Sequence, residues 1–158
     1  MTTASLSDIK KELRTLDRET LEGLCNRLAK YKLENKELLI YLLFEAHDER
    51  AYVENVKEIV RGYFGTLPST NVYLMKKALQ KILRFLNKQI KFSGIKQTEL
   101  ELRIFYCTKM KEARVPRIPG TVLFNHYEQQ LKKIESALNK LPEDLQADYE
   151  RELRQILL

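Results

Sequence analysis

Residues 69–92 constrain the fold most, because this uninterrupted stretch has the periodicity of one long amphipathic helix. At 3.6 residues per turn, its apolar side chains fill a broad face and its cations follow a narrower stripe. The apolar face predicts contact with a core, and the stripe predicts a positively charged surface. The stripe carries Tyr73, Lys77, Lys81, Arg84, Lys88 and Lys91.

Helical periodicity continues along the rest of the chain, in which 5 Gly and 4 Pro are too few for the many turns of an all-β fold. Residues 38–44 are apolar all round, which predicts the central core helix. The connector at 114–121 contains two prolines and predicts a loop. We expect about eight helices, with Pro142 in the first turn of the last one and with these candidate N-caps for the others: Ser5 or Ser7, Asp17, Asn35, Asp48, and Ser69 or Thr70.

The predicted fold class is therefore all-α, with helices packed as antiparallel neighbours. Two architectures fit: a closed helical bundle, or a short array of helical hairpins of the kind found in HEAT and armadillo proteins. No side-chain signature recurs at a fixed period, so the likeness to such arrays concerns packing only. A length of 158 residues without a flexible linker predicts a single domain over residues 1–158.

Positive charge is concentrated in the middle of the chain. Residues 66–120 contain twelve Lys/Arg and three Asp/Glu, a net charge of +9, whereas the remainder carries −3. Such a basic segment indicates either a surface for nucleic acid or another polyanion, or complementarity with acidic neighbours such as Glu54 and Glu58. The candidate polyanion-binding residues are Lys77, Lys81, Arg84, Lys88, Lys91, Arg114 and Arg117.

Motifs for catalysis are missing from the sequence, which has no Gly-rich phosphate loop, no Ser/His/Asp arrangement and no CxxC pair. We therefore expect no enzymatic activity, no cofactor and no metal site. His47 and His126 lack convergent partners in sequence, which favours surface or hydrogen-bonded, half-buried positions. A line of carboxylates at i, i+4 and i+8 is the remaining candidate for a cation or an acid/base pair: Asp144, Asp148 and Glu152.

Compartment and partners follow from two further features. Cys25 and Cys107 have neither disulfide nor metal spacing, so we expect buried free thiols in a reducing cytoplasm. The longest apolar run is seven residues, against about 20 for a membrane span, so we expect no membrane insertion. The leading hypothesis is a non-enzymatic cytoplasmic interaction module that binds a protein partner or a second copy of itself. The alternative is binding of nucleic acid or another polyanion through the basic stripe.

Overall fold

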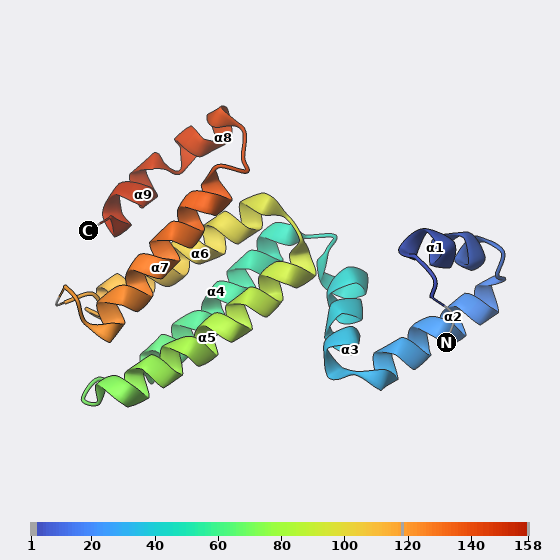
Figure 1. Ribbon diagram of the computed structural model, residues 1–158, viewed down its shortest axis with the longest axis horizontal. Coiled ribbons are helices and arrows are strands. Elements are labelled where there is room, and N and C mark those ends of the chain that lie inside the picture. Colours follow the sequence, from blue (N-terminus) through green and yellow to red (C-terminus); the bar gives the residue numbers. More distant parts are fainter. Residues whose placement is uncertain (1–2, 118, 158) are drawn as a thin grey trace. The chain divides into compact units, whose positions relative to one another are not determined.

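The computed structural model describes residues 3–117 and 119–157, and within these ranges every regular element is helical. Nine α-helices and one π-helical segment occur in the described part, and Figure 1 shows their order along the chain. The predicted all-α class is confirmed. The chain divides into two compact units, Met1–Phe44 and Glu45–Leu158, and each is described by itself. The single-domain assignment for residues 1–158 stays a prediction.

The N-terminal unit consists of short helices whose ends are set by polar side chains. Ser5 caps the first helix, accepting a hydrogen bond from the Asp8 backbone while Asp8 bonds back to Ser5, and Asp17 caps the second. Asn35, expected as a cap, instead donates to the Leu28 carbonyl at 2.8 Å and closes the turn of a helical hairpin. The helices are α1 (Leu6–Arg14), α2 (Arg18–Tyr31) and α3 (Leu33–Ile40).

The expectation that residues 38–44 form the central core helix is wrong. Of these seven residues only Tyr41 is buried, whereas Leu42, Leu43 and Phe44 are 55%, 62% and 65% exposed. The helix also changes type here, from α3 to a π-helical segment, Tyr41–Glu45. An apolar run shows that a helix lacks a polar face, but it does not show which element covers that face.

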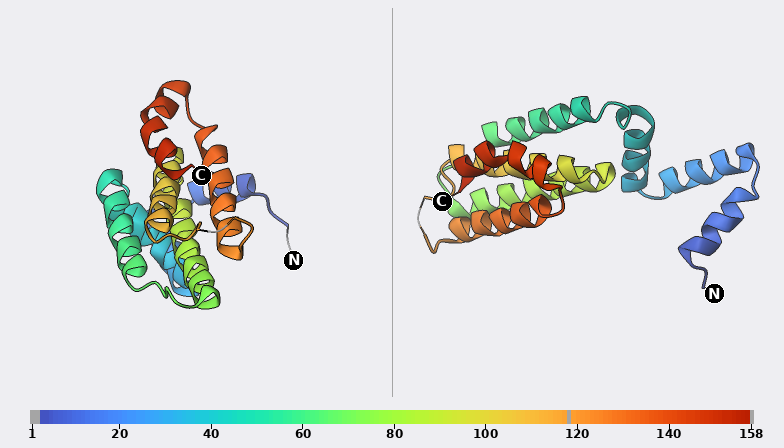
Figure 2. Two further views of the ribbon diagram at one scale, coloured as in Figure 1. Left: turned by 90° about the vertical axis from the view of Figure 1, so that its left-hand side faces the viewer. Right: turned by 90° about the horizontal axis from the view of Figure 1, so that it is seen from above.

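The C-terminal unit holds the well-packed core. Its four long helices run side by side in the views of Figures 1 and 2, and consecutive helices are joined by short connections. The helix pairs α4 (Glu49–Gly65) with α5 (Val72–Ser93) and α6 (Lys96–Glu112) with α7 (Val122–Leu138) contact each other as helical hairpins, as do α2 and α3 within the N-terminal unit. The C-terminal unit also contains α8 (Glu143–Asp148) and α9 (Glu150–Ile156).

Helix α6 is the central element of this unit, because it contacts α4, α5, α7 and α9. Its buried side chains therefore point in several directions instead of forming one stripe. Fully enclosed residues on it are Leu100, Leu102, Tyr106, Cys107 and Met110, each at most 1% exposed. Three charged residues at its edges, Glu99, Glu101 and Arg103, lie in ion pairs, which helps a helix with a polar composition to occupy the centre of a core.

Helix ends in this unit agree with the sequence in part. Asp48 caps α4 and Gly94 ends α5 in the left-handed conformation (φ 67°), both as expected. The α5 cap is Asn71 rather than Ser69 or Thr70. The expected last helix is interrupted at Tyr149, so that α8 and α9 are separate.

Candidate functional site

Helix α5 has the two faces that its sequence predicts. Its buried face consists of Met75, Leu79, Ile82, Leu86 and Ile90. The basic stripe lies on the opposite side: Lys77, Lys81, Arg84 and Lys91 are exposed, and Lys88 is half-buried. No acidic residue occurs on α5, so its own side chains cannot neutralise the stripe. Among the described residues, no ion pair involves Lys77, Lys81, Arg84 or Lys91.

Arg114 and Arg117 lie in the connector between α6 and α7, and both are exposed. Figure 1 shows this connector at the same end of the C-terminal unit as the start of α5. Arg114 has a positive φ of 58°, a conformation that glycine adopts far more readily than arginine. The two arginines therefore belong to the connector and not to α5, and their contribution to a polyanion surface stays a prediction.

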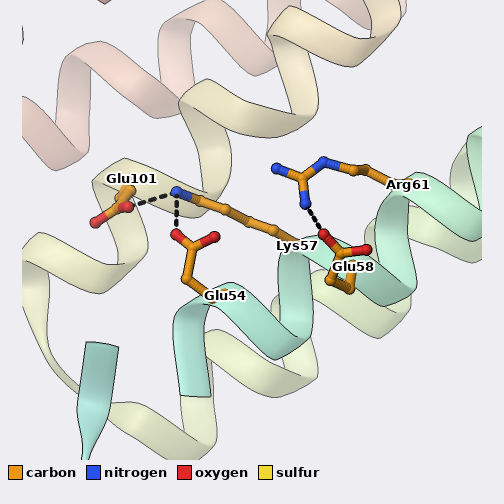
Figure 3. A network of polar contacts seen from close by, with 5 residues as sticks. All are labelled: Glu54, Lys57, Glu58, Arg61 and Glu101. Atoms are coloured by element: carbon orange, nitrogen blue, oxygen red, sulfur yellow. Dashed lines mark hydrogen bonds and ion pairs between the residues drawn. The ribbon is translucent and has the colours of Figure 1, made fainter. Parts of the chain in front are cut away.

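Glu54 and Glu58 of α4, the acidic neighbours considered for the stripe, form ion pairs with cations that are not part of it. Figure 3 shows Lys57 between Glu54 on its own helix and Glu101 on α6, at 3.2 and 2.5 Å from their Oε1 atoms. Glu58 pairs with Arg61, one turn further along α4. Glu54 and Glu58 are thus paired with cations of α4 itself, whereas Glu49 accepts hydrogen bonds from the hydroxyl groups of Ser93 and Thr98.

The Lys57 side chain is only 14% exposed, so its charge needs these partners. Burial on its own lowers the pKa of a lysine, but hydrogen bonds and charges from Glu101 and Glu54 outweigh it and raise the Lys57 pKa. The Arg61 guanidinium lies 5.1 Å from the centre of the Phe105 ring, in cation–π geometry. This network joins α4 to α6.

His126 is buried and hydrogen-bonded, with Nε2 at 3.0 Å from the Tyr106 hydroxyl. That hydroxyl donates its proton to the Leu79 carbonyl at 2.9 Å, so Nε2 of His126 must donate to the Tyr106 oxygen. Burial, and then the charge of Lys76, lower the His126 pKa. A hydrogen-bonded role is confirmed for His126, and the ring is more buried than expected. His47 is exposed.

The remaining candidates from the sequence are not brought together. The break at Tyr149 interrupts the carboxylate line, so Asp144 and Asp148 belong to α8 and Glu152 to α9. No cluster of three or more potential metal ligands is found within residues 3–117 and 119–157. Cys107 is buried, as expected, but Cys25 is exposed, which corrects the prediction of two buried thiols.

Sequence reasoning missed a groove between α5, α6 and α7, with a volume of about 680 Å³. We call it the basic groove, because five of its lining side chains are cations and one is a carboxylate. Three of the cations, Lys91, Lys96 and Arg103, come from the basic central segment, residues 66–120. The other two are lysines from the C-terminal third of the chain. The charged lining residues are Lys91, Lys96, Glu99, Arg103, Lys133 and Lys140.

Comparisons with protein-family models, with curated proteins and with solved structures found no match to this chain. Functional inference therefore rests on the geometry of three surfaces. They are the exposed apolar side chains of the N-terminal unit, the basic stripe and the basic groove.

Within the part of the chain that the structure describes, no helix is both long enough and apolar enough to cross a membrane. The expectation of no membrane-spanning segment agrees with this finding.

Proposed function

We propose that the chain is a non-enzymatic cytoplasmic interaction module that associates with a second copy of itself through its N-terminal unit. The observation that carries this proposal is the exposure of apolar side chains in that unit. Twelve large apolar residues between positions 6 and 44 are 37–85% exposed, and of the residues described there only Tyr41 is buried.

The amount of exposed apolar surface is sufficient for a stable interface. These twelve side chains expose on the order of 1,000 Å², compared with roughly 800 Å² that each partner buries in a standard protein interface. A unit of about 40 residues is also too small to be stabilised by its own core, so a covering partner stabilises its fold as well.

A second copy is the favoured occupant, because the N-terminal unit contains both halves of a helix-in-groove interface. Helix α1 presents Leu6, Ile9 and Leu13, which are exposed and spaced as i, i+3 and i+7. An apolar groove of about 210 Å³ runs between α2 and the segment from α3 into the π-helix, and Leu28 and Leu42 line it. Reciprocal insertion of α1 from each copy gives a closed two-fold dimer.

Light scattering and sedimentation velocity on the full chain test this proposal. Leu28→Glu places a charge in the apolar groove and should weaken the dimer at least about 30-fold, since it loses buried apolar area and buries a carboxylate. Val72→Glu is the matched control: Val72 is 59% exposed and Leu28 60%, but Val72 opens α5 in the other unit. A wild-type monomer up to about 100 μM, or equal effects of both variants, would refute self-association.

The cytoplasmic assignment is supported by the cysteines. Exposed Cys25 and buried Cys107 are both free thiols, a state that reducing compartments maintain. Microscopy of the chain fused to a fluorescent protein in its native cells would check this, and an extracellular or luminal signal would contradict it.

Polyanion binding by the basic stripe is a second candidate function, favoured by those of its cations that are exposed and form no ion pair with any residue that the structure describes. Four such residues on a 22-residue helix without carboxylates form a linear positive surface: Lys77, Lys81, Arg84 and Lys91. Contacts to about four phosphates predict a slope near −3.6 in a plot of log K against log salt for duplex DNA. Lys81→Glu combined with Arg84→Glu should abolish binding while the circular dichroism spectrum stays helical. No DNA or RNA binding at about 20 mM salt would remove this candidate.

A further inference from the structure

The basic groove brings together charges from three helices of the C-terminal unit. Because α6 runs antiparallel to both α5 and α7, the end of α5 and the end of α7 meet the start of α6. Lys91 comes from the last turn of α5, Lys96 from the first turn of α6, Lys133 from α7 and Lys140 from just beyond α7. No sequence segment shorter than 50 residues contains this set, which is why the charge pattern alone did not reveal it.

Its floor is a fixed polar network. Glu99 accepts a hydrogen bond from Nε of Arg103 at 3.1 Å, and Nζ of Lys140 lies 3.9 Å from its other oxygen. Arg103 also donates to the Asn87 side-chain oxygen at 3.2 Å, and its side chain is only 12% exposed. Arg103 is therefore a structural cation whose charge Glu99 already offsets.

The rim of the groove, by contrast, is not neutralised. Lys91, Lys96 and Lys133 are exposed and take part in no ion pair within the described ranges, and Lys140 keeps only its long contact to Glu99. One carboxylate thus faces five cations. Positive charges gathered around a concave, partly apolar surface concentrate the field inside it and attract anions.

A second groove, on the opposite face of α6, is lined mainly by carboxylates, and there the chain provides its own neutralising cation. At 100° per residue, Gln97, Thr98 and Glu101 point away from Lys96, Glu99 and Arg103. The groove on that side has about 380 Å³ and is lined by Glu49, Glu54, Glu101 and Arg50. There the chain supplies its own counter-ion, because Lys57 bonds to both Glu54 and Glu101.

We propose that the basic groove binds an oligophosphate group, a compact anion with several negative charges. Its volume of about 680 Å³ lies within the usual range for small-ligand sites. Lysine ammonium groups on flexible stems suit phosphate oxygens as point charges, and four of them line the rim. The Gln130 side chain, in a residue 6% exposed, adds amide hydrogen-bonding capacity to the lining. This site does not depend on self-association of the N-terminal unit.

Calorimetric titration of the full chain with inorganic tripolyphosphate at 0.15 M salt tests the site. Lys133→Glu with Lys140→Glu should weaken binding at least tenfold, and the neutral Lys133→Gln with Lys140→Gln severalfold. The matched control, Lys77→Glu with Lys81→Glu, changes net charge equally on the exposed face of α5 and should alter binding less than twofold. Helical circular dichroism and an unchanged melting transition establish that each variant is folded.

The control separates a groove from general attraction to a basic protein. Equal losses in the groove and stripe variants, or no binding of tripolyphosphate to the wild type, overturn the proposal. Two sources of the ligand are distinguished with an RNA oligonucleotide carrying either a 5′-triphosphate or a 5′-hydroxyl. Triphosphate-dependent binding that Lys133→Glu with Lys140→Glu removes assigns the groove to nucleic-acid ends. Binding of tripolyphosphate without preference for the triphosphorylated RNA assigns it to a free oligophosphate.

Discussion

Replacing Arg114 with glycine should stabilise the protein, because this residue adopts a left-handed conformation at the end of α6. Ala113 is the C-cap, Arg114 follows with φ 58°, and the Val115 N–H bonds back to the Met110 carbonyl at 3.0 Å. Val115 and Met110 are 2% and 0% exposed, which matches the apolar contact of a Schellman motif. Glycine usually occupies the position that Arg114 has here.

The magnitude follows from two opposing terms. A left-handed conformation costs an L-residue about 1–2 kcal/mol, and glycine avoids this cost. Glycine also makes the unfolded chain more flexible, which lowers the free energy of unfolding by roughly 0.5–1 kcal/mol. The free energy of unfolding should therefore rise by about 0.5–1 kcal/mol, equivalent to a melting temperature increase of about 1–4 °C at this size.

Urea denaturation followed by circular dichroism measures this change, with Arg114→Ala as the control. Alanine removes the same charge but keeps the Cβ atom, so it should give little or no stabilisation. If Arg114→Gly is no more stable than the wild type, the strain argument fails. If alanine stabilises as much as glycine, relief of repulsion from neighbouring cations is the cause instead of backbone conformation.

Two further predictions concern buried titratable groups. Burial and the charge of Lys76 hold the His126 pKa below its ordinary 6.5. Because the unfolded chain then binds the proton at a higher pH than the folded chain, the free energy of unfolding should fall as pH drops below about 6.5. Urea titrations at pH 7.5, 6.5 and 5.5 should show a smaller fall for His126→Gln than for the wild type. Burial raises the pKa of the Cys107 thiol to about 12, so iodoacetamide at pH 8 should label only Cys25 in the folded protein and both cysteines in urea, as read by mass spectrometry. Rapid double labelling of the native chain would contradict the second.

Local sequence patterns predicted the helices well, because capping and periodicity depend on neighbours within a few residues. Ser5, Asp17 and Asp48 accept backbone hydrogen bonds at helix starts, and Gly94 ends α5 with positive φ. Errors arose where several polar residues compete, as at Ser69, Thr70 and Asn71. The break at Tyr149 has no Gly or Pro at that position and so gave no local signal.

Identifying the centre of the core needed information about packing that periodicity does not contain. Residues 38–44 have the more apolar sequence but are largely exposed, whereas α6 contains seven charged residues and is surrounded by four helices. The charges of α6 are tolerated because Glu101 reaches Lys57 and Arg103 reaches Glu99 at the edges of the core. The Lys57–Glu101 pair joins two helices whose relative placement the sequence does not give, whereas Glu99 and Arg103 are four residues apart on α6 itself.

The two basic surfaces differ in the same way: one depends on spacing within a single helix and the other on packing between helices. The basic stripe was predictable because all of its residues lie on one helix, where spacing determines the face. The basic groove was not, because Lys133 and Lys140 reach it only through the antiparallel packing of α7 against α6.

The excess positive charge of residues 66–120 is therefore not one surface. Lys109 pairs with Glu112 at 2.5 Å, and Lys111 donates to the backbone carbonyls of Gln155 and Leu157, so part of this charge stabilises helix ends. Among the described residues, Lys77, Lys81 and Arg84 of α5 form no ion pair and lie on the exposed stripe, whereas Lys91 belongs to the stripe and also lines the groove toward α7. A single extended polyanion surface would make stripe and groove substitutions equivalent for every anion. Two separate surfaces predict opposite effects on affinity. Lys81→Glu with Arg84→Glu should cause the larger loss of affinity for long duplex DNA, and Lys133→Glu with Lys140→Glu the larger loss for tripolyphosphate.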